Sequence, residues 1–393
     1  MKNKLKDSFP IFAANADLVY LDSGASAHKP ASMIDGMMDF LARDYANIHR
    51  GLYPLAERAT AAYDSARAKV ARFLNADVGE VVFTRSTTDG INLLATVFGR
   101  SLTSEDEVFI SASEHHSNLL PWQNTPAKLR IIPVLPDCSL DLDWLAANIG
   151  PHAKIVSITG QSNVLGLQTD IGAAAAIVHS VGAKIIIDAA QLAVHASIDV
   201  KALDIDFLAF SGHKVYGPTG IGVLYGKRAL LEALPPYQYG GDMVESCTLE
   251  RARFMPPPQR FEAGTPPLAE AVGLGLAIDF MESVGLENIA RESLNLTHYA
   301  IKKLAEIHGC RLISSPIANG TVSFSIEGVS PFDVAAILGK KNICVRAGFH
   351  CAEPLHKALG LPGSLRVSLG VYNDSDDIDK FIEALKKVVK ILK

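Results

Sequence analysis

The sequence is poor in cysteine, in net charge and in long apolar runs. Its 393 residues include five cysteines, an odd and widely spaced set that excludes a disulfide-stapled domain and favours a reducing compartment. The N-terminal residues lack the apolar core of a secretory signal. The most apolar stretch, residues 172–194, is interrupted by His179, Lys184 and Asp188, which excludes a membrane span. We therefore expect a cytoplasmic protein.

Several common ligand signatures are also missing. The segment "GPTGIG" (217–222) lacks the glycine spacing of a dinucleotide loop, and no P-loop is present. No CxxC or HExxH pattern indicates zinc, so we expect no metal site. The formal net charge is only −5 and both signs are interspersed, which argues against nucleic acid or anionic membrane as a partner.

The composition is that of a large packed protein. Hydrophobic residues make up 48% and charged residues 20%, and the length predicts two or three packed units. Residues 377–393 place apolar side chains at helical spacing opposite lysines. This pattern fits a helix packed on a core and, less well, a helix lying on a membrane surface.

Short β-branched runs alternate with helical patterns between residues 80 and 225. Unbroken apolar strands separated by helices predict a mostly parallel sheet covered on both faces. Ligands of such sheets bind beyond the carboxyl ends of the strands, so functional residues should follow strands directly. The predicted strands are residues 80–84, 107–111, 130–134, 154–158, 184–188, 206–211 and 222–225.

The remaining sequence predicts a smaller unit. Residues 235–267 are rich in proline and glycine and are expected to be irregular, and a long helical pattern follows over residues 267–285. Strand and helix patterns then alternate from about residue 310 to the end, which is typical of an α+β domain.

Lys214 stands in "FSGHKVYGPTGIG", just after a predicted strand that ends at Ser211. Most loop lysines are simply solvated, and that interpretation fits this position. A strand-end lysine beside His213 and close-approach glycines also suits an imine with an aldehyde cofactor. Lys214 alone does not decide between the two interpretations.

Asp188 follows the apolar run in "KIIIDAAQ", at the end of a predicted buried strand. A carboxylate there needs a cation or several hydrogen-bond donors. It either caps the next helix or pairs with a protonated pyridine nitrogen. A lysine imine with an aspartate on the ring nitrogen is the arrangement expected for pyridoxal phosphate, which favours the second interpretation.

Two further segments follow predicted strands. In "TRSTTDGINLL", Ser86, Thr87 and Thr88 open a helix, where hydroxyls and backbone N–H groups form either an ordinary cap or a phosphate site. In "SEHHSNLLPW", His115 is either a packed or solvated histidine or a side chain stacked on an aromatic ring. Beside the other candidates, we interpret it as stacking.

These motifs together resemble the class V aminotransferase family, pyridoxal-phosphate enzymes of fold type I. The resemblance is carried by "SGHK", "DAAQ", "STTDGIN", "EHHSN" and "SNVLG". The further motifs "YLDSGASAHKP", "NIHRG", "RFEAGTPP", "RAGFHCAEP" and "LRVSLGVYN" resemble group II cysteine desulfurases of the SufS/CsdA type. The similarity covers nearly the whole chain in order.

The resemblance implies a fold and a division of the chain. The fold is an α/β fold, the PLP-dependent transferase fold type I, with a mostly parallel central sheet, helices on both faces and a smaller α+β C-terminal domain. Residues 21–279 form the large cofactor-binding domain. Residues 1–20 and 280–393 form the small domain, which carries the cysteine loop.

The resemblance also implies a role for each matching residue. Lys214 holds the cofactor and moves the Cα proton, Asp188 pairs with the ring nitrogen, and Gln191 contacts the phenolic oxygen. His115 stacks on the ring and assists proton transfer, while Asn163 and Arg366 bind the substrate carboxylate. The phosphate is held by Thr87, Thr88, Ser211 and His213, with Thr265 reaching in from the second subunit of a homodimer.

Cys351 lies in "RAGFHCAEP" among polar and flexible residues, so we do not expect it to be buried in a hydrophobic core. The resemblance implies that its thiolate takes the sulfur of L-cysteine as a persulfide and that L-alanine leaves. A neighbouring imidazole or the cationic site is a possible source of thiolate stabilisation. Phe349 and Gly24 depart from the commonest family pattern, which bears on substrate fit.

Partners and rival functions follow from the same resemblance. We expect a sulfur-acceptor protein of the SufE or SufU kind, for iron–sulfur cluster or other sulfur-compound biosynthesis. Within the fold, a selenocysteine lyase or another class V aminotransferase-fold enzyme is the nearest alternative. A non-catalytic scaffold that keeps the fold is the alternative from another class, and Lys214 argues against it.

Overall fold

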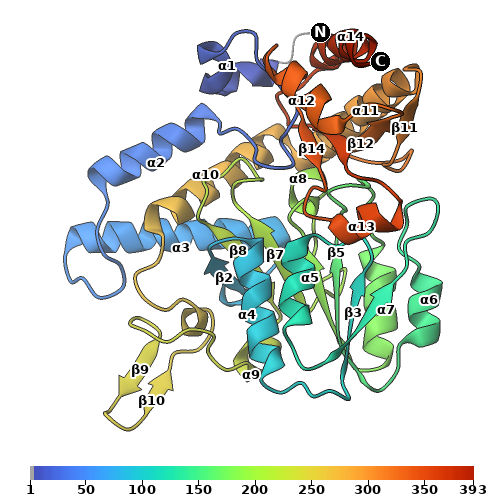
Figure 1. Cartoon of the computed structure of the whole chain (residues 1–393). Helices are drawn as coiled ribbons and strands as arrows, with labels where there is room; N and C mark the ends of the chain where they lie inside the picture. Colours follow the sequence, from blue (N-terminus) through green and yellow to red (C-terminus); the bar gives the residue numbers. More distant parts are fainter. Residues whose placement is uncertain (1–3) are drawn as a thin grey trace.

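A seven-stranded sheet forms the centre of the molecule. The computed structural model describes residues 4–393 (Figure 1). The strand order across the sheet is β2-β8-β7-β6-β5-β3-β4, and β8 runs antiparallel to both neighbours while the other strands share one direction. The strands are β2 (Val81–Thr84), β3 (Glu107–Ser111), β4 (Lys128–Ile132), β5 (Ala153–Thr159), β6 (Lys184–Asp188), β7 (Phe207–Ser211) and β8 (Gly222–Gly226). Each strand predicted in this region is confirmed.

Helices cover both faces of this sheet because its strands are apolar on both sides. In β6, Ile185 and Ile187 join the core beneath α3, α7 and α10, while Ile186 joins the core beneath α4 and α5. This period-two alternation confirms the predicted sheet with helices on both faces. The helices are α1 (Pro10–Ala14), α2 (Ala31–Arg43), α3 (Pro54–Leu74), α4 (Thr87–Gly99), α5 (His116–Gln123), α6 (Leu142–Asn148), α7 (Ile171–Ser180), α8 (Leu192–His195), α9 (Arg228–Ala233), α10 (Leu268–Val284), α11 (Leu286–Ala305), α12 (Pro331–Gly339), α13 (Glu353–Ala358) and α14 (Ser375–Leu392).

A second, antiparallel sheet lies in the C-terminal part, with the order β11-β12-β15-β14. The strands are β11 (Cys310–Leu312), β12 (Thr321–Ile326), β14 (Arg346–Gly348) and β15 (Ser364–Ser368); β13 (Ile343–Cys344) pairs in parallel with β1 (Val19–Tyr20). In β15, Leu365 and Val367 join the core beneath α11, α12 and α14. The alternate residues Ser364, Arg366 and Ser368 are also buried, on the opposite face of the strand. This polar face of β15 supplies Arg366 to the candidate site.

Helix α14 packs onto the small sheet through Phe381, Leu385 and Val388, as the core-packing interpretation predicted. Within residues 4–393, no helix combines the length and the apolar composition needed to cross a membrane. The boundary predicted at residues 279 and 280 falls inside α10, and the division of the chain into two domains stays a prediction.

One expectation about local structure was wrong. The segment predicted to be irregular contains an antiparallel hairpin, β9 (Val244–Cys247) with β10 (Ala252–Phe254), which projects from the body (Figure 1). Its residues are exposed or half-buried, so no apolar alternation marks the strands in the sequence. The flanking prolines and glycines also favoured the prediction of an irregular segment.

Candidate active site

A cavity of about 350 Å³ opens where the carboxyl ends of β5, β6 and β7 face β14 and β15. Its volume is within the range of small-molecule sites. Most of the residues predicted for the site line this one cavity: Thr87, Thr88, His115, Asn163, Asp188, Gln191, Ser211, His213, Lys214, Cys351 and Arg366. The exception is Thr265, which is exposed on the segment before α10 and is not among the lining residues.

Asp188 ends β6, Lys214 follows the neighbouring strand β7, and both residues line the cavity. Asp188 is the last residue of β6 and only 4% exposed, and its Oδ1 accepts a hydrogen bond from Ala190 N–H at 2.9 Å. Because Gln191 is the N-cap of α8, Asp188 does not cap that helix. Burial raises the pKa of the Asp188 carboxyl. Among residues 4–393, no cationic group forms an ion pair with Asp188, and a protonated ring nitrogen would stabilise such a buried carboxylate.

The electrostatics of Lys214 favour its neutral form. Burial lowers the pKa of the Lys214 amine to about 8, and the charge of Asp188 opposes that shift. An amine with a pKa close to neutrality is a better nucleophile toward an aldehyde than an ordinary lysine, because more of it is unprotonated.

Hydroxyl groups gather at one end of the cavity. Ser211 Oγ accepts from Thr87 N–H at 2.8 Å and lies 2.7 Å from Thr87 Oγ1, and Thr88 Oγ1 lies 2.7 Å from Ser117 Oγ. These groups come from the end of β7 and the first turns of α4 and α5. They form a cluster suited to an anionic group such as a phosphate.

The turn before α4 is held close to β8. Ser86 is the N-cap of α4, and its Oγ accepts from Asp89 N–H at 3.2 Å, so the cap that the sequence allowed is present. At Gly222, a Cβ would lie only 2.5 Å from Ser86 Cα. Only glycine permits this close approach, which places the N-terminal end of α4 in the cavity wall.

His115 is the N-cap of α5, and its Nδ1 accepts from Ser117 N–H at 3.0 Å. Burial, aided by the charge of Lys214, lowers the pKa of His115 to about 3. The imidazole is therefore neutral, with its proton on Nε2. The preceding residue, Glu114, was missed from the sequence; its carboxyl is buried beneath the site, accepts from Thr159 N–H at 2.8 Å, and has a pKa raised by burial to about 8.

Gln191 and Gly24 join the cavity to the polar face of β15. Gln191 Nε2 donates to Gly24 O at 2.8 Å, and Gly24 N–H donates to Ser368 Oγ at 2.8 Å. A Cβ at Gly24 would lie 3.0 Å from the Ser368 side chain. The glycine that departs from the family pattern therefore occupies a tight position.

Arg366 projects from β15 and is 3% exposed. Its Nη1 and Nη2 donate to Asn163 O and Asp22 Oδ1, both at 3.3 Å, and its Nε has no partner among residues 4–393. Asp22 also holds Arg346, with Nη2 to Oδ2 at 2.9 Å. Asp22 and Arg346 were not singled out from the sequence, although both lie in motifs that it contains. Two guanidinium groups share one carboxylate here, which leaves positive charge for an anionic substrate group.

Cys351 lines the same cavity and is also exposed to solvent, as is Cys247 on the hairpin, whereas the other cysteines are half-buried. His350 and Cys351 both have positive φ, 51° and 56°. Left-handed backbone costs a non-glycine residue about 1–3 kcal/mol. The cysteine therefore stands on a turn that its surroundings must hold in place.

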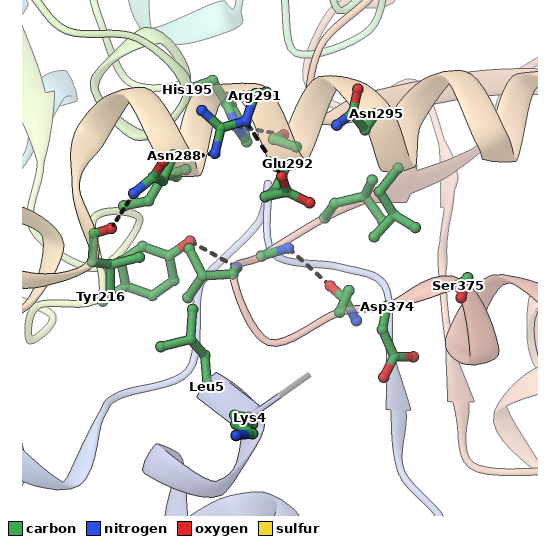
Figure 2. A pocket seen from close by; sticks show the side chains of 18 of the residues that line it. Lys4, Leu5, His195, Tyr216, Asn288, Arg291, Glu292, Asn295, Asp374 and Ser375 are labelled. Atoms are coloured by element: carbon green, nitrogen blue, oxygen red, sulfur yellow. Dashed lines mark hydrogen bonds and ion pairs between the residues drawn. The ribbon is translucent and has the colours of Figure 1, made fainter. Parts of the chain in front are cut away.

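A second cavity, of about 870 Å³, lies elsewhere. It is bounded by α11, the segment around Lys4 and the loop that follows β15 (Figure 2). Inside it, Tyr216 Oη accepts from Val371 N–H at 3.1 Å, and Ser293 Oγ lies 3.2 Å from His195 Nδ1. None of the residues predicted for the site lines it.

Comparisons with known proteins agree with this geometry. The Aminotransferase class-V family model matches residues 19–381. A probable cysteine desulfurase of Halalkalibacterium halodurans is 42% identical, over 98% of this chain and 97% of its own. The crystal structure of the cysteine desulfurase CsdA from Escherichia coli is similar with a TM-score of 0.93 at 38% identity, covering 99% of this chain and 98% of that chain. The apo structure of cysteine desulfurase from Thermococcus onnurineus NA1 gives 0.94 at 35%, covering 99% of both.

These likenesses extend over the full length of the chain, so they bear on the whole fold and not on single motifs. They confirm the predicted fold type I, with its mostly parallel central sheet and C-terminal antiparallel sheet. Members of the matched family use pyridoxal phosphate. The chain belongs to the Aminotransferase class-V family, among its cysteine desulfurases.

Proposed function

We propose that this protein uses pyridoxal phosphate on Lys214 to convert L-cysteine to L-alanine and that Cys351 takes the sulfur as a persulfide. The observation that carries the proposal is the single cavity shared by Lys214, Asp188, Arg366 and Cys351. An amine, a buried carboxylate, a guanidinium and an exposed thiol in one site are the groups that this reaction requires.

The donor set fits the cofactor. The Lys214 amine matches its aldehyde, the Asp188 carboxylate matches its ring nitrogen, and the hydroxyls of Thr87, Thr88 and Ser211 match its phosphate. His213 lines the same cavity. When bound, pyridoxal phosphate supplies an electron sink that labilises the bonds at the substrate Cα and weakens the C–S bond.

The residues of the chain divide the remaining work. Lys214, with its low pKa, accepts and returns the proton at the substrate Cα. Neutral His115, with its proton on Nε2, would stack on the cofactor ring and would have Nε2–H free to donate to it. Gln191, which lines the cavity, would contact the phenolic oxygen of the cofactor. Arg366, with an unused Nε–H and Asn163 beside it, orients the substrate carboxylate.

The sulfur transfer balances without an external oxidant. The Cys351 thiolate attacks the substrate sulfur, an S–S bond forms and the C–S bond breaks. The electron pair stays with the substrate carbon, which takes up a proton and leaves as L-alanine. A later thiol or acceptor protein of the SufE or SufU kind removes the outer sulfur from Cys351 and restores the enzyme.

The decisive experiment replaces Cys351 by serine. The Cys351→Ser variant keeps the absorbance of the bound cofactor but forms neither persulfide nor alanine from L-cysteine. Cys247→Ser is the matched control, because Cys247 is the other exposed cysteine and is remote from the cavity, and it keeps activity. Turnover by Cys351→Ser at the wild-type rate would remove Cys351 from the reaction. Borohydride reduction of the holoenzyme followed by peptide mapping should place the cofactor label on Lys214. A label on another residue would exclude Lys214 as the cofactor lysine.

A homodimer completes the proposed site. Thr265 is exposed and outside the cavity of its own chain, and large apolar side chains such as Leu52, Tyr239 and Leu249 are exposed on the projecting loops and hairpin. Exposed apolar groups of this kind are typical of an association surface. We expect a dimer by light scattering and weaker cofactor retention in Thr265→Ala.

A further inference from the structure

The turn that carries Cys351 has an unfavourable backbone. Ala352 N–H donates to Phe349 O at 2.8 Å, which closes a four-residue turn around His350 and Cys351. Both central residues have positive φ, positions that asparagine and glycine ordinarily occupy. Cysteine has no such preference and histidine only a modest one, so other contacts must help to maintain this conformation.

Two groups that belong to the large-sheet region donate hydrogen bonds to the backbone carbonyls of this turn. Asn163 Nδ2 donates to His350 O at 2.7 Å, and His116 N–H donates to Cys351 O at 2.7 Å. Asn163 follows β5 and His116 begins α5. These contacts fix the turn relative to the cavity, but they involve only its backbone carbonyls and not the side chain of His350.

The His350 ring belongs to a buried relay with Ser364 and His356. His356 Nδ1 lies 3.0 Å from Ala352 O, and because a carbonyl only accepts, this nitrogen carries the proton. Burial lowers the pKa of both histidines, to about 2 for His350, so both rings are neutral. His356 Nε2 must then accept from the Ser364 hydroxyl at 2.9 Å.

The direction of the last bond follows from the others. Since the Ser364 proton is directed to His356, Ser364 Oγ accepts from His350 Nε2–H at 3.0 Å. One tautomer of each ring therefore satisfies the whole relay, and His350 is held by a directed bond. His350, His356 and Ser364 are all buried. Neutral His350 adds no positive charge beside Cys351, so its contribution is to position the turn.

We propose that the His350–Ser364–His356 relay positions Cys351 for sulfur transfer by holding its left-handed turn in the cavity. The inference rests on the proposed role of Cys351 as the sulfur acceptor. Without the relay, the turn relaxes to an ordinary conformation and the thiol leaves the attacking position. The cofactor-binding residues and the Arg366 guanidinium lie outside the relay and keep their positions. Asn163, which donates to His350 O, stays on the segment after β5.

The test compares Ser364→Ala with Ser323→Ala. Ser323 is equally buried on the adjacent strand β12, and its Oγ has no hydrogen-bond partner among residues 4–393, so it is a matched control outside the relay. In Ser364→Ala, kcat for L-cysteine falls roughly ten- to hundredfold while KM and the cofactor absorbance stay unchanged. The rate of Cys351 alkylation by iodoacetamide, read by mass spectrometry, changes as the thiol is displaced. Ser323→Ala matches the wild type in each measurement.

A second substrate separates positioning from structural damage. Chloride leaves β-chloro-L-alanine without attack by a thiol, so Ser364→Ala should process this compound at the wild-type rate. Equal loss of both reactions, or wild-type alkylation and kcat, would overturn the inference. If Ser364→Ala fails to fold, His350→Asn tolerates the left-handed conformation, lacks the ring and serves the same comparison. Failure of the proposed function is recognised separately, by turnover of L-cysteine in Cys351→Ser.

Discussion

Glu262 stabilises the fold next to the segment that contains Thr265. Its carboxylate forms a buried bidentate ion pair with Arg67, in which the Nη1–Oε1 and Nη2–Oε2 distances are both 2.7 Å. The side chains are 4% and 8% exposed for Arg67 and Glu262. Phe83 N–H donates to Glu262 Oε1 at 2.7 Å, and Tyr63 Oη donates to Oε2 at 3.1 Å. We predict that Glu262→Ala is strongly destabilising.

The magnitude follows from what the substitution leaves behind. Arg67 would keep its charge in a buried position, with Val81 O at 2.7 Å as its remaining acceptor. Removing one partner of a buried ion pair costs about 3–5 kcal/mol, most of which is the uncompensated charge. The orphaned Phe83 N–H and Tyr63 hydroxyl are part of the same loss and are not added separately.

Urea titrations of the holoenzyme, at several protein concentrations, measure the free energy of unfolding. The matched control is Glu282→Ala, because Glu282 pairs with Arg72 at 2.6 Å on an exposed surface and its loss costs about 0–1 kcal/mol. The double variant Arg67→Met with Glu262→Leu removes both charges and recovers most of the stability. A Glu262→Ala loss as small as that of Glu282→Ala would refute the reasoning.

Three further outcomes are expected. The rate of imine formation between pyridoxal phosphate and the apoenzyme rises about tenfold from pH 7 to 9, with a midpoint near the Lys214 pKa of about 8. Asp188→Asn lowers this midpoint, because the charge of Asp188 raises the Lys214 pKa. A midpoint near 10 would contradict the expectation. Arg366→Lys keeps the cofactor spectrum but lowers kcat/KM for L-cysteine about 10- to 100-fold, because lysine lacks the two-pronged fork; an unchanged kcat/KM would exclude Arg366 from substrate binding. Gly320 has a φ of 70°, and a Cβ there would overlap the buried His195 ring, so Gly320→Ala loses about 2–4 kcal/mol of stability. Gly328→Ala loses about 1–2 kcal/mol, because φ is 74° and nothing lies within 4 Å of its Cβ. Equal losses in thermal unfolding would contradict the steric argument.

Local pattern was sufficient for the central sheet. The runs that became β5, β6 and β7 are apolar on both sides, and such runs between helices are stable only in a doubly covered parallel sheet. The same reasoning placed Asp188 and Ser211 at strand ends and therefore at one edge. The hairpin β9–β10 was not predictable in this way, because it is exposed and buries no alternating apolar face.

The polar contacts within the site could not be read from the sequence. Asp22 and Arg346 are separated by 324 positions and meet because β1 pairs with β13 and β15 lies beside β14. The tautomer of His350 likewise depends on Ser364 and His356, which the fold of the small sheet brings together. The spacing of these residues along the chain, whether 324 positions or 14, carries no information about which side chains meet.

By itself, the sequence determined the residue types of the chemistry and the edge of the sheet where they gather, since strand periodicity and motif order are local properties. Only the tertiary structure decided which of these groups are buried, which carry a proton and how the cysteine turn is held. Burial and hydrogen-bond direction depend on neighbours that are distant in the chain, and they set the charge state on which the proposed reaction depends.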